Sequence, residues 1–141
     1  MRALIQRVSS ASVSTREGNV NSIDQGFCIL LGVGPNDTEE IAEKLWSKIS
    51  KLRIFEDQNG KTNLSLSDVS GAVLLVSQFT LYADCHKGNR PSFTKGASPD
   101  LANRLYEYFA QLVRDDGVEL KTGWFGARME VSPIVALLHS G

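Results

Sequence analysis

The spacing of hydrophobic residues predicts strands along most of the chain and a helix in two places. "ALIQRVSSASVS" alternates for part of its length, and "FCILLGV" is a continuous apolar run that is typical of a central strand. "EGNVNSIDQG", between them, is rich in turn residues and predicts the close of a hairpin. Further strands are predicted at "LRIF", "GAVLLVSQFTLY", "VELKT", "ARMEV" and "IVALL".

Two segments have helical spacing instead. Hydrophobic residues recur at intervals of three and four over residues 38–51 and again after residue 98, as a helix with one buried face requires. Ser98 is a good N-cap, Pro99 fits the first helical position, and Gly117 fits the end of the second helix. The residues expected on the buried faces are Ile41, Leu45, Ile49 and Leu52 in the first helix and Leu101, Leu105, Tyr108 and Leu112 in the second.

These elements predict a single α/β domain over residues 1–141, with about seven strands and two main helices. The composition agrees, because 42% hydrophobic and 22% charged residues are an ordinary globular mixture. No apolar run approaches the roughly 20 residues that span a bilayer, and the N-terminal sequence lacks the apolar core of a signal peptide. We therefore expect a cytoplasmic protein with no membrane partner.

Charge and metal-ligand content exclude other classes of function. A net charge of −1 gives the chain no general affinity for nucleic acid, so we expect no DNA partner and contact with RNA only through a local patch or an RNA end. Cys28 and Cys85 are too few and too far apart for a disulfide scaffold or a zinc knuckle, and Cys28 is expected in the core. With two histidines in the chain, we expect no metal site.

The segment "VLLVSQFTLYAD", residues 73–84, changes from apolar to polar within a predicted strand. Its first four residues are apolar on both faces, and Ser77, Gln78 and Thr80 follow within four positions. The simplest geometry is a strand that leaves the core and ends beside a cleft. Each polar side chain could instead bond a neighbouring backbone group, and Thr80 could serve β-propensity. The cluster as a whole, next to the loop "DCHKGNRPSF", favours the cleft.

Two kinds of chemistry are open to this cluster. Ser77 or Thr80 could be a nucleophile with His86 as its base, or the cluster could bind a ligand's carbonyl, ribose or amine and position a water molecule. A nucleophile needs an orienting acid and an exposed, strained serine, and the sequence has no G-x-S-x-G motif, so binding is favoured. In the neighbouring segments, Phe93 and Phe125 could stack on a base or pack in the core.

Several separate segments resemble the D-aminoacyl-tRNA deacylases. They are "MRALIQRVSSASV", "LRIFEDQNGKTNLSL", "VSQFTLYAD", "KGNRPSFTKGASPDLANRLYEYF" and "TGWFGARMEVS". The likeness runs from Met1 to about Ser132, in order and nearly without gaps. It implies a homodimer of compact α/β subunits with barrel-like sheets, which hydrolyses the ester joining a D-amino acid, or glycine, to the terminal ribose of tRNA. It implies no metal or cofactor.

The resemblance also assigns residues to roles. The family's S-Q-x-T motif matches Ser77, Gln78, Phe79 and Thr80, which implies that they line the pocket for the terminal adenosine and the aminoacyl group. We expect Gln78 and Thr80 nearest the chemistry, with Ser77 and Phe79, together with Phe93 and Phe125, binding the substrate. The likeness implies that backbone groups and the RNA's 2′-hydroxyl do the work, without a threonine nucleophile.

The sequence departs from the family near its end. The family's second motif, N-x-G-P-V-T, forms a turn that reaches into the partner subunit's pocket and excludes L-amino acids. Here "MEVSPIVALLHSG" lacks about five residues, including the glycine, and Pro133 is the candidate for the family proline. Arg7 matches the first-strand arginine that supports this turn. Without the resemblance, the alternative interpretation is that Arg7 forms an ordinary surface salt bridge.

We predict a D-aminoacyl-tRNA deacylase from this resemblance. One rival is a dimeric protein that binds the tRNA 3′ end and has lost catalysis or chiral selectivity with the missing turn. A remoter rival is a small-molecule esterase that uses Thr80 and His86. The missing turn also predicts a bend or bulge at Ser132–Pro133, because proline cannot donate to a sheet ladder.

Overall fold

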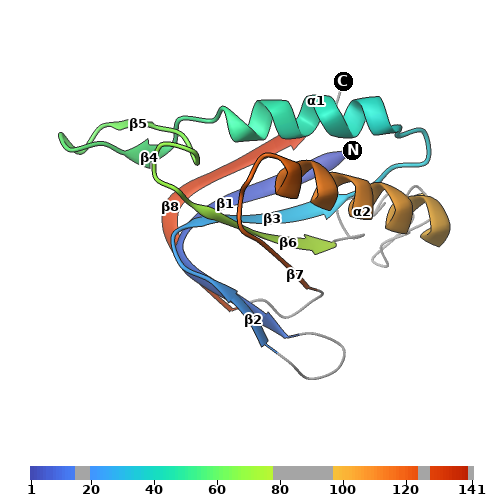
Figure 1. The fold of residues 1–141 in the computed structure, drawn as a ribbon, viewed down its shortest axis with the longest axis horizontal. Helices are drawn as coiled ribbons and strands as arrows, with labels where there is room; N and C mark the ends of the chain where they lie inside the picture. Colours follow the sequence, from blue (N-terminus) through green and yellow to red (C-terminus); the bar gives the residue numbers. More distant parts are fainter. Residues whose placement is uncertain (15–19, 78–96, 124–127, 140–141) are drawn as a thin grey trace, which may run out of the picture.

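A six-stranded sheet forms the centre of the computed structural model (Figure 1). The structure describes residues 1–14, 20–77, 97–123 and 128–139, the last range as a backbone. The sheet runs in the order β2-β1-β3-β6-β7, and β8 pairs with the other edge of β1. These strands are β1 (Arg2–Ser14), β2 (Val20–Ile23), β3 (Gly26–Gly32), β6 (Ala72–Ser77), β7 (Leu120–Gly123) and β8 (Arg128–His139).

The pairing directions explain why β3 is apolar throughout. β3 lies between β1, with which it is antiparallel, and β6, with which it is parallel. Both of its faces are covered, as the continuous run "FCILLGV" predicted. Cys28 lies fully buried in this strand, as expected, and burial raises the pKa of its thiol to about 12.

Side chains alternate between two hydrophobic clusters, one on each face of the sheet. In β6, Val73 and Leu75 belong to the cluster on the helix side, and Leu74 and Val76 belong to the cluster on the opposite side. This confirms the alternation expected of a strand that is buried on both faces. The end of β6 leaves this environment, since Ser77 is partly exposed.

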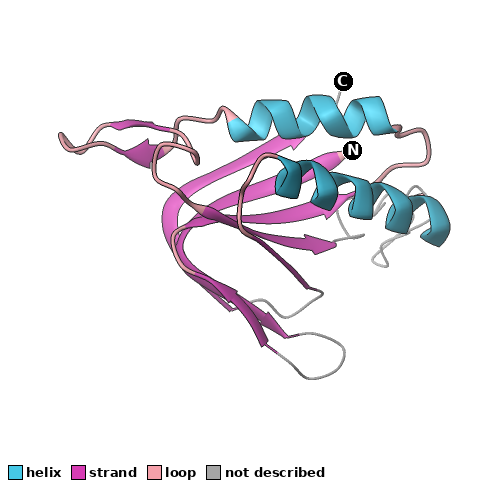
Figure 2. Cartoon of the chain, in the orientation of Figure 1, coloured by secondary structure: helices cyan, strands magenta, loops and turns pink. Residues whose placement is uncertain are grey.

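Two helices cover one face of the sheet (Figure 2). Helix α1 (Glu39–Ser50) is capped by Thr38, whose hydroxyl accepts the Ile41 N–H. Helix α2 (Pro99–Asp115) begins in the same way at Ser98, the predicted cap. Gly117 follows α2 with a φ of 76°, a conformation that favours glycine. In the part of the chain that is described, neither helix is long and apolar enough to cross a membrane.

The predicted buried face of each helix needs a correction of about one residue. Leu45, Ile49 and Leu105 are buried as expected, whereas the other predicted positions are only partly buried. Side chains one position along the helix fill the core instead. The residues buried from the helices are Ala42, Leu45, Trp46 and Ile49 in α1 and Leu105, Tyr106, Phe109, Ala110 and Val113 in α2.

Two strand predictions were wrong in detail, and one hairpin prediction was confirmed. "LRIF" contributes only Phe55 to β4 (Phe55–Glu56), because the residues before Phe55 continue from the C-terminus of α1. β4 pairs with β5 (Thr62–Leu64) in a small hairpin. The turn-rich segment after β1 was predicted to close a hairpin, and this is confirmed, since it contains β2, which pairs antiparallel with the far end of β1. "ARMEV" and "IVALL" are one strand, β8, because both halves pair with the long β1.

The sheet curves until its two ends meet, which confirms a barrel-like α/β fold close to the predicted element count (Figure 1). We call the meeting place the seam, formed by Val13 and Asn21 on one side and Thr122 and Gly123 on the other. The Asn21 side chain donates from Nδ2 to the Thr122 carbonyl at 2.7 Å. A Cβ atom on Gly123 would lie 2.1 Å from a Val13 methyl group, so the seam requires glycine at this position.

Candidate functional site

Ser77 is the part of the predicted polar cluster that the structure describes. It is the last residue of β6 and is paired with Leu31, near the end of β3. On the other side of β6, Val76 is paired with Gly123, the last residue of β7. The C-terminal ends of the parallel strands β3, β6 and β7 therefore lie side by side at one edge of the sheet. Ser77 leaves the core at this edge, as predicted. That the edge borders a functional cleft stays a prediction.

The chain returns to this same edge at Ala97. The Ala97 N–H donates to the Val33 carbonyl at 3.0 Å, two residues beyond the partner of Ser77. Ser98 then caps α2. The points at which the chain leaves β6 and enters α2 are thus both attached to the end of β3.

Five predicted site residues lie outside the described residues. They are Gln78, Phe79, Thr80, Phe93 and Phe125. Their roles, and that of His86, stay predictions. Within the described residues, no group of three or more His, Cys, Asp or Glu side chains could hold a metal ion.

Tyr106 is a residue near the site that the sequence pattern missed. Its hydroxyl donates to the Leu75 carbonyl at 2.8 Å, two residues before Ser77, and burial raises its pKa to about 12. The neutral phenol therefore fixes α2 to the end of β6. The segment "LYEYF" has two tyrosines, and helical spacing alone favoured Tyr108 for the buried face; a rotation of one residue places Tyr106 there.

Arg7 is buried, with 7% of its surface exposed, so the reading as an ordinary surface salt bridge was wrong. Its guanidinium donates from Nη1 to the Ile54 carbonyl at 2.7 Å, and Nη2 lies 3.9 Å from the Glu56 carboxylate. Arg7 is paired with Phe27, at the opposite end of β3 from the partner of Ser77. Arg7 and Ser77 are therefore not brought together within the described chain.

The backbone does bring Arg7 next to Pro133. In the ladder between β1 and β8, Gln6 is paired with Val135 and Val8 with Val131. Residues 132–134 therefore all lie opposite Arg7, which confirms the predicted bulge at Ser132–Pro133. A proline fits there because the bulge interrupts the ladder of donors.

The fold defines a small α/β protein with a strongly curved sheet, and its candidate site lies where the central strands of that sheet end. Comparison with known proteins gives the family. The chain belongs to the D-Tyr-tRNA(Tyr) deacylase family, whose model matches residues 4–136.

Relatives match over almost their whole length. A D-aminoacyl-tRNA deacylase of Thermotoga petrophila is 51% identical over 99% of this chain and 97% of its own, and one of Desulfatibacillum aliphaticivorans is 54% identical over 99% of both. Each alignment spans 145 positions, although this chain has 141 residues. Both relatives therefore carry residues that have no counterpart here. The predicted shortening of the second motif stays a prediction.

Solved structures confirm the fold. A structure titled "c-Myc DNA Unwinding Element Binding Protein" has a TM-score of 0.87 and 34% identity, and covers 100% of this chain and 99% of its own. A probable eukaryotic D-amino acid tRNA deacylase has a TM-score of 0.85 at 17% identity, with 97% of both chains covered, which is evidence for the fold alone.

Proposed function

We propose that this protein hydrolyses the ester bond between a D-amino acid and the 3′ end of a tRNA, a proofreading activity in translation. The observation that carries the proposal is the match to relatives of this name over nearly complete chains. The position of Ser77 supports it, because the S-Q-x-T motif begins where β6 ends beside β3 and β7.

The protein needs to lower the activation barrier only modestly, because an aminoacyl ester is already activated toward hydrolysis. Water adds to the ester carbonyl, the bond from carbon to the ribose oxygen breaks, and that oxygen takes up the proton which the water loses. A donor that faces the carbonyl oxygen stabilises its developing negative charge, and one such donor can be worth about 3–4 kcal/mol. We assign Gln78 and Thr80 to the positioning of water and ester, with no covalent intermediate.

The other site residues bind the substrate in this proposal. Ser77 and Phe79 line the pocket, and Phe93 and Phe125 contact the terminal base. Pro133 borders the amino-acid side, supported by Arg7 in the neighbouring strand. The adjacency of Arg7 to residues 132–134 in the β1–β8 ladder supports this last assignment.

The partners follow from the same proposal. The protein binds the aminoacylated end of the tRNA in the cytoplasm, and its net charge of −1 supports an interaction confined to that end. It acts as a homodimer, in which residues near Pro133 of one subunit approach the pocket of the other. Sedimentation at micromolar concentration tests the dimer.

Hydrolysis of D-tyrosyl-tRNA and L-tyrosyl-tRNA by the purified protein tests the activity. We expect release of D-tyrosine well above the rate without protein, and slower release of L-tyrosine. The variant Asp24→Asn, in the exposed turn before β3, is a matched control that should keep the activity. Tight binding of the tRNA end without hydrolysis would favour the binding protein instead, and hydrolysis of simple esters alone would favour the esterase.

A further inference from the structure

A cavity of about 480 Å³ lies at the opposite edge of the sheet from the candidate site, where both helices end and β6 and β7 begin (Figure 1). Its lining comes from the end of α1, the loop between β5 and β6, and the loop between α2 and β7. Gly71, which lines the cavity, directly precedes β6, and Ser77 ends that strand, so the two places are roughly 20 Å apart. Cavities of this size hold small organic ligands.

The most deeply buried side chains that line the cavity are apolar. Trp46 is 4% exposed and Leu66 is 2% exposed, and Val118 beside them is partly buried. The Trp46 indole is held in place, because its Nε1 donates to Asp116 Oδ2 at 2.6 Å and its ring packs edge to face against Phe109. A fixed aromatic ring offers a pre-formed surface to the apolar part of a ligand, which lowers the entropic cost of binding.

The rim of the cavity carries negative charge that nearby side chains do not neutralise. Asp116 and Glu119 are exposed, and neither forms an ion pair within the part of the chain that the structure describes. Among the described residues that line the cavity, none is lysine or arginine. Asp116 also caps the C-terminus of α2, where the helix dipole favours a cation and disfavours a carboxylate. The rim therefore favours a positively charged ligand.

We propose that this cavity binds a small organic amine with an apolar body. The ammonium group lies between Asp116 and Glu119, and the apolar body packs on Trp46 and Leu66. The exposed hydroxyl of Ser67 is available to a polar substituent. A carboxylate on the ligand would be repelled by both rim charges. Binding here does not depend on the proposed function, because the cavity lies at the other edge of the sheet.

Tyramine and hydroxyphenylpropionate test this site, because they share a phenol ring and differ in charge. The first is a cation at neutral pH and the second is an anion. The reporter is the Trp46 indole N–H signal in proton–nitrogen correlation spectra, which Trp46→Phe identifies among the two tryptophans of the chain. We expect tyramine to shift this signal to saturation and the anion to leave it unchanged.

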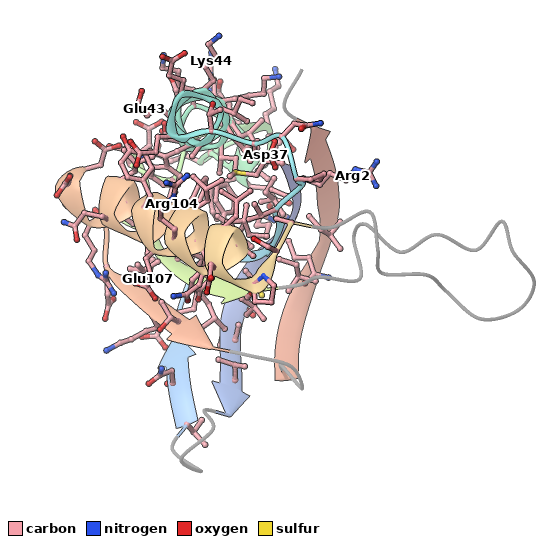
Figure 3. The ribbon with its side chains drawn as sticks, turned by 90° about the vertical axis from the view of Figure 1, so that its right-hand side faces the viewer. Arg2, Asp37, Glu43, Lys44, Arg104 and Glu107 are labelled. Atoms are coloured by element: carbon pink, nitrogen blue, oxygen red, sulfur yellow. The ribbon has the colours of Figure 1, made fainter. Side chains whose placement is uncertain are left out.

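Matched variants show whether the rim charges select the ligand. Glu119→Gln removes one charge at an exposed position, and Asp116→Asn removes the other while it keeps an oxygen for the Trp46 indole. We expect each variant to bind tyramine about fivefold more weakly, as for the loss of one exposed ion pair. Glu107→Gln removes an equal charge from the exposed surface of α2, outside the cavity, and should leave the affinity unchanged (Figure 3).

A variant that fills the cavity separates a binding site from a mere group of surface charges. Ser67→Phe keeps both carboxylates and adds a ring to the lining, so it should abolish the shift and also the rise in Tm that bound tyramine produces in the wild type. Circular dichroism establishes that each variant is folded. A Trp46 signal that tyramine does not move would overturn the proposal. Equal binding of the anion, equal weakening in Glu107→Gln, or unchanged binding in folded Ser67→Phe would also overturn it.

Discussion

A single polar atom in the core connects α2 to the sheet. The Tyr106 hydroxyl donates to the Leu75 carbonyl, and the ring around it is buried among apolar side chains. Burial opposes the charged phenolate, which raises the pKa of Tyr106 from 10.0 to about 12. The folded protein therefore keeps this group neutral over a pH range in which the unfolded chain ionises.

Tyr106→Phe should change the pH dependence of stability. At pH 7 the variant loses one buried hydrogen bond, which costs about 1 kcal/mol. Above pH 10 the Tyr106 phenol ionises in the unfolded wild type but stays neutral in the folded wild type. The free energy of unfolding of the wild type therefore falls as the pH rises from 10 toward 12. The variant lacks this phenol and does not share the loss. Urea unfolding at several pH values should show the two curves converging. Curves that stay parallel up to pH 12 would contradict the assignment.

Thr80→Val should retain measurable deacylation. Valine keeps the β-branched shape and removes only the hydroxyl, which in our proposal positions water and forms no bond to the substrate. We expect kcat to fall by no more than about a hundredfold, within the range of one lost oxyanion donor. Mass spectrometry of the quenched reaction provides the decisive check, because an aminoacyl group covalently attached to Thr80 would show that it is the nucleophile.

Residues differ in how far their environment can be predicted from sequence. Cys28 lies in an apolar run, so its burial follows from its neighbours, and the change at Ser77 follows from the polarity of the strand. Arg7 offers no such signal, because it follows Gln6 in an ordinary alternating strand, and its partners Ile54 and Glu56 lie far away in the sequence. Burial of a charged side chain by distant segments leaves no local periodicity.

At the scale of elements, β8 contains an irregularity in its pairing with β1. Three residues lie opposite Arg7 where a regular ladder would place one, and a second register shift follows between Val8 and Ser10. β8 nevertheless pairs with β1 as far as His139. The bulge accommodates the proline without ending the strand.

The predicted shortening of the second motif should weaken chiral discrimination. A short bulge extends less far from the sheet than the family's turn, so we expect a smaller ratio of D-tyrosyl to L-tyrosyl hydrolysis than in a relative that carries the additional residues. Parallel assays of this protein and the Thermotoga petrophila relative measure that ratio. Inserting the relative's additional residues at Ser132–Pro133 should raise it, and equal ratios in all three proteins would refute the role of the bulge.

Gly123→Ala should destabilise the protein at the seam. The added methyl group would meet the Val13 side chain, and such overpacking costs about 1–3 kcal/mol. Val13→Ala removes the obstructing methyl groups, so the double variant should be more stable than the sum of the single effects predicts. Urea unfolding of the four proteins measures this coupling, and strict additivity would show that the two residues do not meet.

At the scale of the whole molecule, both helices and the order of the main strands could be predicted, whereas the closure of the sheet could not. Caps such as Thr38 and Ser98 are local signals, and both helices begin where these signals lie. The seam depends on Asn21 meeting Thr122, about a hundred residues later, and on the curvature of every strand between them. One strand's periodicity carries no information on such a contact, and the barrel-like shape was expected only from the family resemblance.

The binding of tRNA should depend only weakly on salt. A protein with a net charge of −1 that binds only an RNA end neutralises few phosphates. With about three phosphate contacts, raising the salt from 50 to 200 mM would weaken binding by roughly 20-fold. Fluorescence anisotropy with uncharged tRNA measures this slope. A loss of a thousandfold over the same range would reveal an extensive basic surface.

The pairing of β1 with β8 affects how the protein folds during synthesis. β1 is the first strand to be made and β8 the last of the eight described, and ribosomes add about 5–20 residues per second. One edge of a long, half-apolar strand therefore remains without its partner for several seconds or more, in a fold whose many distant contacts already favour slow folding. An uncovered edge of this kind readily pairs with other chains, so the nascent protein should depend on a chaperone that shields β1 until β8 has emerged.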